Sequence, residues 1–468
     1  MAYNTLSLDE TRSEIEYCET LRKAYAALQN QLINVLPTID ADNPLSTGRT
    51  LKRIEVQVSD VEILGWLENQ PFESKVYWRG RDGEFEVAGI EISDQIKTAA
   101  RADVFRKLDI RLKRSTLPIR YYGHVIFHEN CLAEEWQPFG VSRFILPSVE
   151  LYRNSRGVFL ACIFFLNSAS IYRTFDILES LNPDPQARLS ELLTPLSRRD
   201  LPGFATWQEN VSAALESFEK SLLKKVVLSR KTDFHFSHNL TPLSILKRLK
   251  SSSPAAFHFC FQLNEHNAFL GASPERLYSR QHSLIKTEAL AGTRPRGATL
   301  SEDAELKAQL LNSEKDLREH RFVVDEIQNN LQTFCSTTDI DDQFDVLQLS
   351  RVQHLLCRMQ GVLQEKVNDG EIIASLHPTP AVGGFPKQTA LNLIQEIEPF
   401  DRGLFAAPVG WVAKDAAEFA VGIRSGLAQK NKLSLFAGAG IVAGSNSAAE
   451  WSEIENKMNC FVNATMSV

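Results

Sequence analysis

The chain of 468 residues lacks the features that mark several classes of protein. Its seven cysteines form no C-x-x-C pair, which argues against a zinc knuckle or a redox dithiol and favours reduced thiols. Its net charge of −7 offers no basic surface for a nucleic acid. Its most apolar run, GVFLACIFFL at 157–166, is too short to cross a bilayer and predicts a buried strand. We therefore expect neither a nucleic-acid partner nor a membrane.

The absence of targeting segments, repeats and nucleotide-binding motifs excludes further classes of protein. The N-terminal stretch MAYNTLSLDETRSEIEYCE is polar and acidic, without the apolar or Arg-rich character of a targeting segment, so we expect a cytoplasmic protein. We find no internal repeat, no P-loop and no dinucleotide-binding G-x-G-x-x-G after a strand. Apolar residues make up 43 % of the chain and charged residues 23 %, as in ordinary globular enzymes. The chain is long enough to bury a large core.

Strand patterns occur in runs rather than in strict alternation with helices. Residues 50–150 are rich in short alternating segments, and a Pro-, Ser- and charge-rich stretch at 181–203 separates them from the rest. This order predicts an α+β fold with large antiparallel β-sheets flanked by helices. We expect a division into residues 1–203 and 204–468. Helical spacing predicts helices at 9–36, 205–222, about 301–332, 349–357, 387–397 and from Ser447 onward.

An acidic face is predicted on the last helix. In SAAEWSEIENKMNCF, at 447–461, Glu450, Glu453 and Lys457 are spaced i, i+3 and i+7, which places them on one side of a helix. Two carboxylates on one face repel each other unless a cation lies between or beside them. A solvated face, with Glu453 paired to Lys457, is the alternative interpretation.

A second acidic helix is predicted in NSEKDLREHRFVVDEI, at 312–327. Asp316 and Glu319 lie on its polar side. Octahedral Mg²⁺ is usually held by one or two carboxylates together with water and substrate oxygens. One carboxylate from each helix, Glu319 and Glu453, would therefore suffice for a magnesium site.

A glycine-rich strand precedes the last helix. In LSLFAGAGIVAGS, at 433–445, successive backbone N–H groups around Gly438 and Gly440 are expected to form an anion-binding nest; a tight turn with small residues is the alternative. Nearby, Arg424 interrupts an apolar strand, and an arginine in such a place usually meets an anion.

Two residues are candidates for proton transfer. Lys225 lies at the head of the strand KKVVLSRK, and a buried lysine can act as a base. Glu275 follows a Ser-Pro turn in the apolar segment GASPERL, where burial raises the pKa of a carboxyl and suits it to general acid catalysis. An ordinary basic strand end is the alternative for Lys225. His377 lies in the Pro/Gly-rich loop HPTPAVGGFP, and a lone histidine is usually structural.

Together, in this order, nine segments resemble the blocks of the chorismate-utilising enzymes. The resemblance covers roughly residues 205–463 and implies an anthranilate synthase component I-like fold, with residues 1–203 as a variable N-terminal part of the same fold. The segments are KVVLSR, GASPERL, LAGTRPRG, SEKDLREH, HPTPAVGGFPK, GWV, VGIRSG, FAGAGIVAGS and EWSEIENK.

Within that family the sequence resembles the isochorismate synthases most. Lys225 stands at the position where the water-using members of the family have their base. The ammonia-using anthranilate synthases have a non-basic residue at this position. Ala291 stands where aminodeoxychorismate synthases carry a nucleophilic lysine, and HPTPAVGG differs from the usual salicylate synthase loop. The resemblance implies the substrate chorismate and no glutaminase subunit. The resemblance is compatible with menaquinone biosynthesis and with siderophore biosynthesis as the pathway that uses the isochorismate.

The resemblance also implies roles for individual residues. Lys225 would be the base and Glu275 the acid, with Mg²⁺ held by Glu319 and Glu453 and oriented by Asp316 and Glu450. We interpret Lys224, Glu288, His320 and Glu455 as structural. The implied substrate-binding residues are Thr293, His377, Arg424, Gly438, Ala439, Gly440 and Lys457.

Three other functions are considered. A salicylate synthase would form isochorismate and then eliminate pyruvate. A non-catalytic chorismate-binding protein would need neither Lys225 nor Glu275. A Mg²⁺-dependent phosphoesterase would show an Asp-rich two-metal pattern, which this sequence lacks.

Overall fold

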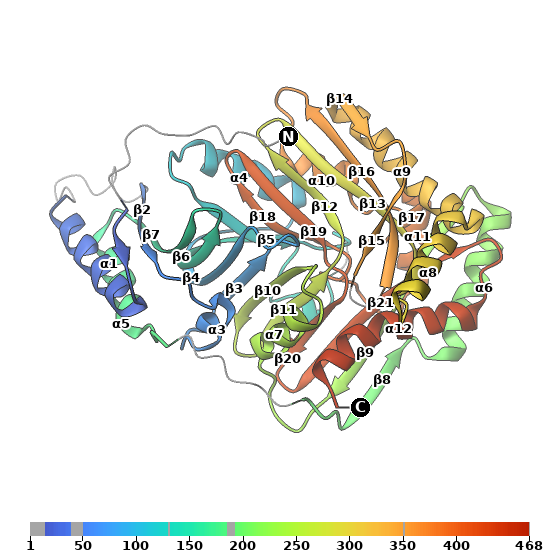
Figure 1. Cartoon of the computed structure of the whole chain (residues 1–468), viewed down its shortest axis with the longest axis horizontal. Helices are drawn as coiled ribbons and strands as arrows, with labels where there is room; N and C mark the ends of the chain where they lie inside the picture. Colours follow the sequence, from blue (N-terminus) through green and yellow to red (C-terminus); the bar gives the residue numbers. More distant parts are fainter. Residues whose placement is uncertain (1–14, 39–49, 130–131, 185–191, 350–351, 468) are drawn as a thin grey trace.

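Two curved antiparallel sheets, packed face to face and flanked by helices, form the protein (Figure 1). The computed structural model describes residues 15–38, 50–129, 132–184, 192–349 and 352–467, without the side chains of Thr293, Lys315 and Glu319. The predicted α+β class with large antiparallel sheets is confirmed. In the described part of the chain, no helix combines the length and apolar character needed to cross a membrane.

The first sheet runs from the N-terminal region to the glycine-rich strand. Almost all its neighbours are antiparallel; the short β1 (Tyr17–Cys18) pairs in parallel with β2. In spatial order its strands are β2 (Leu51–Val58), β7 (Gly157–Phe165), β6 (Ser142–Asn154), β4 (Glu86–Thr98), β3 (Lys75–Arg79), β10 (Phe257–Asn264), β11 (Asn267–Ser273), β20 (Ser425–Gln429), β21 (Lys432–Val442) and β9 (Lys225–His235), with β8 (Ser197–Leu201) and β17 (Gly384–Phe385) on β9.

The second sheet shares the β4–β6 pair with the first. Its strands continue in the order β5 (Arg120–Val125), β18 (Pro408–Ala413), β19 (Ala416–Val421), β12 (Arg276–Gln281), β13 (Leu284–Pro295) and β16 (Val352–Leu363), with β14 (Cys335–Ile340) and β15 (Asp345–Gln348) along β16.

A corner in β4 and β6 joins the two sheets. Residues 149–154 of β6 pair with β7, whereas residues 142–145 pair with β5. Between these segments the β4–β6 register shifts, from Ile92 opposite Pro147 to Asp94 opposite Leu146. Such a bulge bends a strand and increases its twist. One long strand pair therefore serves both sheets, and residues 1–203 and 204–468 are interleaved through the sheets.

An aromatic core fills the space between the sheets. Trp78 on β3, Phe144 on β6 and Phe419 on β19 are almost fully buried. Phe105 packs edge-to-face against Phe144 and Phe419, with ring centroids 5.5 and 6.2 Å apart. Large rings bury much apolar area and prefer this geometry. This core fixes the separation of the sheets, and so the width of the cavity at their edge.

Helices cover the outer faces and both ends. α1 and α5 lie at one end of the molecule, and α6, α8 and α9 at the other (Figure 1). The final helix α12 packs on β9 and β21 through Ile454 and Met458. The bounds are α1 (Leu21–Val35), α3 (Ile63–Glu68), α4 (Arg101–Lys113), α5 (Ser168–Ser180), α6 (Phe204–Lys220), α7 (Pro242–Ser252), α8 (Leu300–Asn312), α9 (Glu314–Phe334), α10 (Asp369–Leu376), α11 (Lys387–Ile397) and α12 (Ser447–Thr465), with 3₁₀ turns at Leu36–Thr38 and Glu134–Trp136.

Three of the predicted helices differ in the structure. The segment 349–357 was predicted as a helix, and this prediction is wrong because residues 352–363 form β16. Cys357, Met359, Gly361 and Leu363 are buried while the residues between them are exposed, which is the period of two of a strand. The segment 301–332 is two helices, because the Ser313 side chain accepts a hydrogen bond from the Asp316 N–H and begins α9. The first helix, predicted over 9–36, begins at residue 21, and the prediction is wrong for residues 15–20, which include the strand β1; residues 1–14 lie outside the described residues.

Candidate active site

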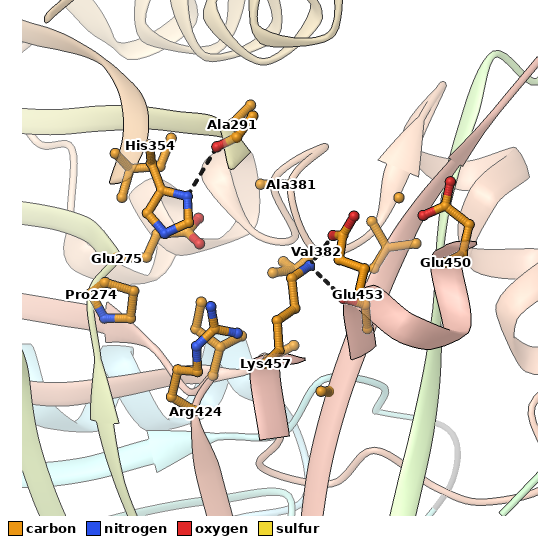
Figure 2. Close-up of a pocket in the computed structure, with 18 of the residues that line it drawn as sticks. Pro274, Glu275, Ala291, His354, Ala381, Val382, Arg424, Glu450, Glu453 and Lys457 are labelled. Carbon is orange, nitrogen blue, oxygen red and sulfur yellow. Dashed lines mark hydrogen bonds and ion pairs between the residues drawn. The ribbon is translucent and has the colours of Figure 1, made fainter. Parts of the chain in front are cut away.

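A cavity of about 240 Å³ lies where β9 and β21 of the first sheet face β13 and β16 of the second. Helix α12 closes one side and the loop before β17 lies across from it (Figure 2). Residues of the loop before β18 also line the cavity. Its volume exceeds that of several water molecules, so a small ligand can enter. Nine of the residues predicted from the sequence line it: Lys225, Glu275, Asp316, Arg424, Gly438, Gly440, Glu450, Glu453 and Lys457.

Lys225 is the first residue of β9 and is 2 % exposed. It pairs with Val442 of β21 on one side and with Phe385 of β17 on the other. Its position in the sheet therefore fixes the backbone from which the side chain reaches the cavity.

Glu275 lies between β11 and β12, on a turn with several internal hydrogen bonds. The Ser273 hydroxyl donates to the Val421 carbonyl at 2.6 Å and accepts from the Glu275 N–H at 3.3 Å. The Glu275 carbonyl accepts from the Val421 N–H at 3.1 Å. The turn is thereby bound to the neighbouring strand β19, and the Glu275 carboxyl is directed into the cavity.

The Glu275 carboxyl is 5 % exposed, and burial raises its pKa to about 7. The neighbouring carboxylate of Glu288 contributes to this rise of the pKa, whereas the Thr379 hydroxyl and the cations Lys225 and Arg424 act in the opposite direction. The resulting pKa lies close to neutral pH. A carboxyl of this kind is suited to give up a proton during a reaction.

Arg424 lies in the turn before β20 and lines the cavity. Its backbone adopts a φ of +50°, a region that non-glycine residues rarely occupy. Residues held in such conformations cluster at functional sites because the surrounding fold must maintain them. Burial lowers the pKa of the guanidinium, while the carboxylates of Glu453 and Glu275 favour its charged form. Arg424 therefore brings a desolvated cation to the cavity.

The acidic residues of α12 reach the cavity with a lysine beside them. Asn446 caps the helix by accepting hydrogen bonds from the N–H groups of the first turn. Glu450, Glu453 and Lys457 all line the cavity, as their spacing on one helix face predicts. The Lys457 ammonium lies 2.6 Å from Glu453 Oε1 and donates to the Gly438 carbonyl at 2.8 Å (Figure 2). The ion pair between Glu453 and Lys457, which the alternative interpretation placed on a solvated helix face, is thus present, but it lies at a wall of the cavity.

Helix α9 brings a further carboxylate to the cavity. Asp316 is 8 % exposed and pairs with Arg294 of β13 at 2.6 Å. The predicted metal ligand Glu319 is one turn further along this helix, but its side chain lies outside the described residues, as does that of Thr293.

The glycine-rich segment is an extended strand, so the predicted anion-binding nest is not formed. Gly438 and Gly440 line the cavity from within β21, paired with Ser229 and Val227 of β9. A nest needs helical rather than extended backbone. The glycines keep this wall free of side chains instead: a Cβ on Gly438 would come within 2.9 Å of the Ser229 hydroxyl. Ala439 points away from the cavity and packs in the core below α12.

His377 lies behind the cavity wall. It is 1 % exposed, packs edge-to-face on Phe127 and donates from Nε2 to the Ala406 carbonyl at 2.8 Å. Burial lowers its pKa well below the usual value, so the ring is neutral. Ala406 itself lines the cavity with a φ of +58°. His377 therefore contacts the backbone of Ala406, which forms part of the cavity wall.

Two functional candidates were missed by the sequence reasoning. His354 lines the cavity from β16 and contacts the Gly292 carbonyl through Nδ1 at 3.0 Å. Burial, together with Arg424, lowers the pKa of its imidazole to about 4. Because the segment around His354 was predicted as a helix, its side chain could not be placed; the alternation after Cys357 is the signal that would have revealed the strand.

Arg402 is the second missed residue. It is 1 % exposed and pairs with Glu398 at 2.5 and 2.8 Å. It also donates to the carbonyls of Val227 and Val382, at 2.7 and 2.8 Å, and both of these residues line the cavity. Arg402 therefore connects two walls of the site.

We expect Arg402→Met to lower the free energy of unfolding by about 3–5 kcal/mol, because the substitution leaves the buried Glu398 carboxylate without its cation. Urea denaturation measures the effect. Arg358→Met is the matched control: Arg358 is about half exposed, and losing its pairs with Asp341 and Asp345 should cost at most about 1 kcal/mol. Equal effects of the two substitutions would contradict the role of Arg402.

The donor set at the cavity fits a magnesium ion. In the part of the chain that the structure describes, no three His, Cys, Asp or Glu side chains form a ready metal cage. Mg²⁺ does not need one, since it usually takes one or two carboxylates and completes its octahedron with water and substrate oxygens. Glu450, Glu453 and Asp316 supply carboxylates to one cavity, and none of its lining residues is a cysteine.

Comparison with known proteins identifies the family. Residues 45–466 match the model of the family described as chorismate binding enzyme. The chain belongs to this family. The match includes most of the N-terminal part, beyond the residues 205–463 from which the resemblance was drawn.

This chorismate-binding enzyme is similar to several characterised members. It is 32 % identical to isochorismate synthase MenF of Haemophilus influenzae over 417 residues, covering 87 % of this chain and 90 % of that protein. The solved structure of MenF, the menaquinone-specific isochorismate synthase of Escherichia coli, matches with a TM-score of 0.83 at 27 % identity, over 94 % of this chain and all of the other. Anthranilate synthase component 1 of Saccharolobus solfataricus is 36 % identical over 262 residues, covering 55 % of this chain and 62 % of that protein.

Proposed function

We propose that this chorismate-utilising enzyme is an isochorismate synthase that interconverts chorismate and isochorismate in the presence of Mg²⁺. The observation that carries the proposal is the pairing of Lys225 and Glu275 in one cavity. Both are buried, and the Glu275 carboxyl has a pKa of about 7. A base and an acid in one site are what this reaction requires.

The reaction adds one water molecule and releases another. Lys225, acting as the base, takes a proton from the water whose oxygen bonds to ring carbon C2. The two ring double bonds shift, the bond between C4 and its hydroxyl breaks, and protonated Glu275 gives its proton to the departing hydroxyl. Because substrate and product are isomers that both contain a conjugated diene, we expect an equilibrium without strong preference for either.

The cations of the cavity suit a dianionic substrate. Arg424 and Lys457 can each meet a carboxylate, because both line the cavity and both are only partly exposed, and a charge-assisted hydrogen bond is strong in such a place. The Gly438 carbonyl accepts from Lys457, and in an extended strand the N–H of the same residue faces the same side. We therefore propose that the Gly438 N–H is directed to the substrate.

Glu453, together with Glu319, would hold Mg²⁺, with Glu450 and Asp316 orienting its waters. When bound, the ion neutralises negative charge on the ring carboxylate of chorismate. The present ion pair between Glu453 and Lys457 occupies the same carboxylate, so loading with metal and substrate would redistribute these contacts.

Two residues bear on the identity of the nucleophile. Lys225 provides a base beside the ring, which an ammonia-using enzyme does not need. Ala291 lines the cavity where a lysine nucleophile would otherwise stand, so a covalent intermediate with an aminodeoxychorismate synthase-type lysine is not expected. The similarity to an anthranilate synthase over part of the chain makes this distinction necessary.

The purified protein, incubated with chorismate and Mg²⁺ and analysed by chromatography, tests the proposal. Isochorismate that disappears when EDTA is added is the expected product. Salicylate and pyruvate would identify a salicylate synthase. Anthranilate formed in the presence of ammonium would identify an anthranilate synthase. The absence of any product would favour a chorismate-binding protein without catalysis.

We expect Glu453→Gln to weaken Mg²⁺ binding by more than the roughly 10–100-fold typical of losing an outer-shell partner, because a neutral amide replaces a charged oxygen ligand. Isothermal titration of Mg²⁺ into the protein without chorismate measures affinity without turnover. Glu455→Gln is the control, since Glu455 lies on the same helix but pairs with Arg198 and Arg230 instead. An unchanged affinity in Glu453→Gln would place the metal elsewhere.

A further inference from the structure

A residue of the N-terminal part reaches the turn that carries Glu275. Arg81 lies in the turn between β3 and β4, a region in which the sequence shows no motif. This turn is well defined: the Gly80 N–H donates to the Phe85 carbonyl at 2.9 Å, and the Gly83 N–H donates to the Gly80 carbonyl at 3.0 Å. The side chain of Arg81 is 15 % exposed and extends over the ring of Phe257.

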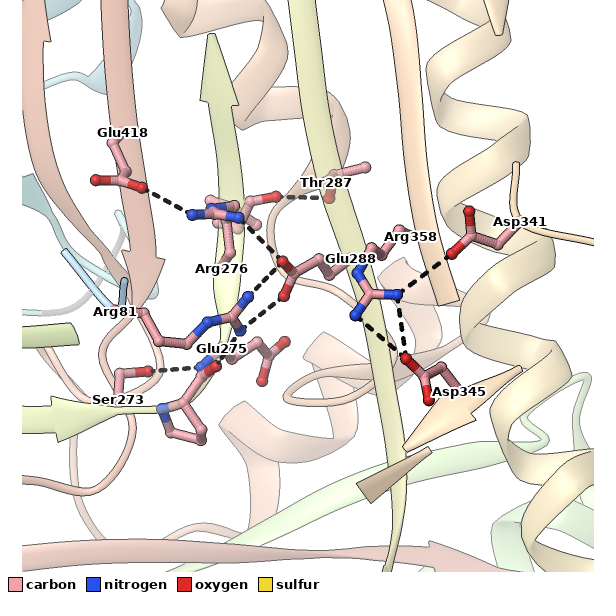
Figure 3. A network of polar contacts seen from close by, with 12 residues as sticks. Arg81, Ser273, Glu275, Arg276, Thr287, Glu288, Asp341, Asp345, Arg358 and Glu418 are labelled. Carbon is pink, nitrogen blue, oxygen red and sulfur yellow. Dashed lines mark hydrogen bonds and ion pairs between the residues drawn. The ribbon is translucent and has the colours of Figure 1, made fainter. Parts of the chain in front are cut away.

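The Arg81 guanidinium makes three hydrogen bonds at once (Figure 3). Nη1 donates to the Pro274 carbonyl at 2.9 Å, directly before Glu275. Nη1 and Nη2 also donate to the two carboxylate oxygens of Glu288, at 2.8 and 2.6 Å. A bidentate arginine–carboxylate pair is both strong and directional, and lysine cannot reproduce it.

Glu288 is the second part of this arrangement. Its side chain is 5 % exposed on β13, next to the Glu275 turn. Besides Arg81, it accepts from Arg276 at 3.0 Å, and Arg276 in turn pairs with Glu418 at 3.1 Å. Glu288 was interpreted as structural from the sequence. The structure shows a buried carboxylate, held by two arginines, behind the proposed catalytic acid.

We propose that Arg81 and Glu288 are positioning residues for the Glu275 carboxyl: Arg81 fixes the Pro274–Glu275 backbone and holds the Glu288 carboxylate next to the acid. Neither residue lines the cavity itself; they act on the substrate only through Glu275. In this way the N-terminal part of the chain contributes to the site.

Charged groups on several elements surround Glu275, and each favours either its protonated or its ionised form. Lys225 on β9 and Arg424 before β20 favour the ionised carboxylate. Glu288 on β13 favours the protonated form, and burial acts in the same direction. Arg81 and Arg276 neutralise part of the Glu288 charge. Removing Arg81 and removing the Glu288 charge should therefore shift the protonation of Glu275 in opposite directions.

Two substitutions separate these effects. In Arg81→Gln the Glu288 charge is less neutralised, so the titration midpoint of Glu275 should rise by roughly one pH unit. In Glu288→Gln the like charge is lost while Arg81 and Arg276 remain, so the midpoint should fall by a similar amount. Arg79→Gln is the matched control: Arg79 lies two residues away and donates to the Pro254 carbonyl, away from Glu275, and should leave the midpoint unchanged.

Infrared spectroscopy follows the protonated carboxyl directly and needs no turnover. The difference between wild type and Glu275→Gln identifies the Glu275 carbonyl band, whose loss with rising pH gives the midpoint, expected near 7 in the wild type. Circular dichroism verifies that each variant is folded. If Arg81→Gln does not fold, the shift of the Glu275 titration midpoint in Glu288→Gln tests the proposal by itself. A midpoint that stays at the wild-type value in Glu288→Gln would overturn the proposal.

The kinetic consequence rests on the proposed isochorismate synthase function. We expect Arg81→Gln to lower kcat about 10-fold or more, with KM changed less than about twofold, because the acid is displaced while the substrate contacts remain. A KM effect with unchanged kcat would contradict a positioning role. If the wild type does not convert chorismate but the infrared midpoints shift in opposite directions, the positioning of Glu275 stands and the assigned reaction fails.

Discussion

Replacing Lys225 with glutamine should lower kcat for isochorismate formation by about 10²–10⁴-fold, the usual contribution of a general base. Glutamine has similar length but cannot accept the proton of the attacking water. Lys225 is 2 % exposed, so bulk water cannot easily replace it. Affinity for chorismate should change little, because Arg424 and Lys457, rather than Lys225, are assigned to the substrate carboxylates.

Lys224→Gln provides a matched control, since Lys224 precedes Lys225 in sequence but is exposed. It should turn over chorismate at the wild-type rate. Steady-state kinetics and calorimetric titration with chorismate, performed on both variants, separate catalysis from binding. A Lys225→Gln enzyme with wild-type kcat would show that another group removes the proton, and His354 is then the next candidate because it lines the same cavity.

Replacing Glu275 with glutamine should abolish turnover and at the same time stabilise the protein at alkaline pH. The pKa of this carboxyl is raised from 4.5 to about 7 in the folded state. A raised pKa means that the folded protein favours the protonated form, so stability is lost as pH rises from the unfolded to the folded pKa. One pKa unit corresponds to about 1.4 kcal/mol, so ionised Glu275 costs about 3 kcal/mol above pH 7, and glutamine removes this cost.

Urea denaturation at two pH values measures the free energy of unfolding and tests the prediction. Below about pH 4.5 the carboxyl is protonated in both states, and the variant should be as stable as the wild type. At about pH 8 it should be more stable by about 3 kcal/mol. Glu219→Gln, at an exposed position on α6, should show no such difference. A loss of stability in Glu275→Gln at alkaline pH would mean that the carboxylate is well compensated in the folded state, contrary to the role of an acid.

Local patterns predicted most of the fold. The buried strand at 157–166 and the helices at 205–222 and 387–397 appear as β7, α6 and α11. The shared corner of the two sheets could not be predicted, since it depends on β6 pairing with different strands along its length. The strand β16 was missed because its first residues, through Cys357, are all at least partly buried and show no period of two.

The residues that line the cavity could be predicted where one segment carries its own signal. Glu450, Glu453 and Lys457 follow from helical spacing, and Lys225 and Glu275 from polar residues in apolar segments. Arg81 and Arg402 were not found because their partners are remote in the chain: the Arg81–Pro274 bond spans 193 residues and the Arg402–Val227 bond 175. No local pattern reports such a contact.

The turnover of chorismate in water enriched in ¹⁸O tests the central claim most directly. If Lys225 activates water for attack at C2 and Glu275 assists loss of the C4 hydroxyl, isochorismate carries one solvent oxygen, located at C2 by mass spectrometric fragmentation. Isochorismate without label would mean that the hydroxyl migrates within the substrate, which leaves no role for a base that activates water. That result would contradict the account of this cavity.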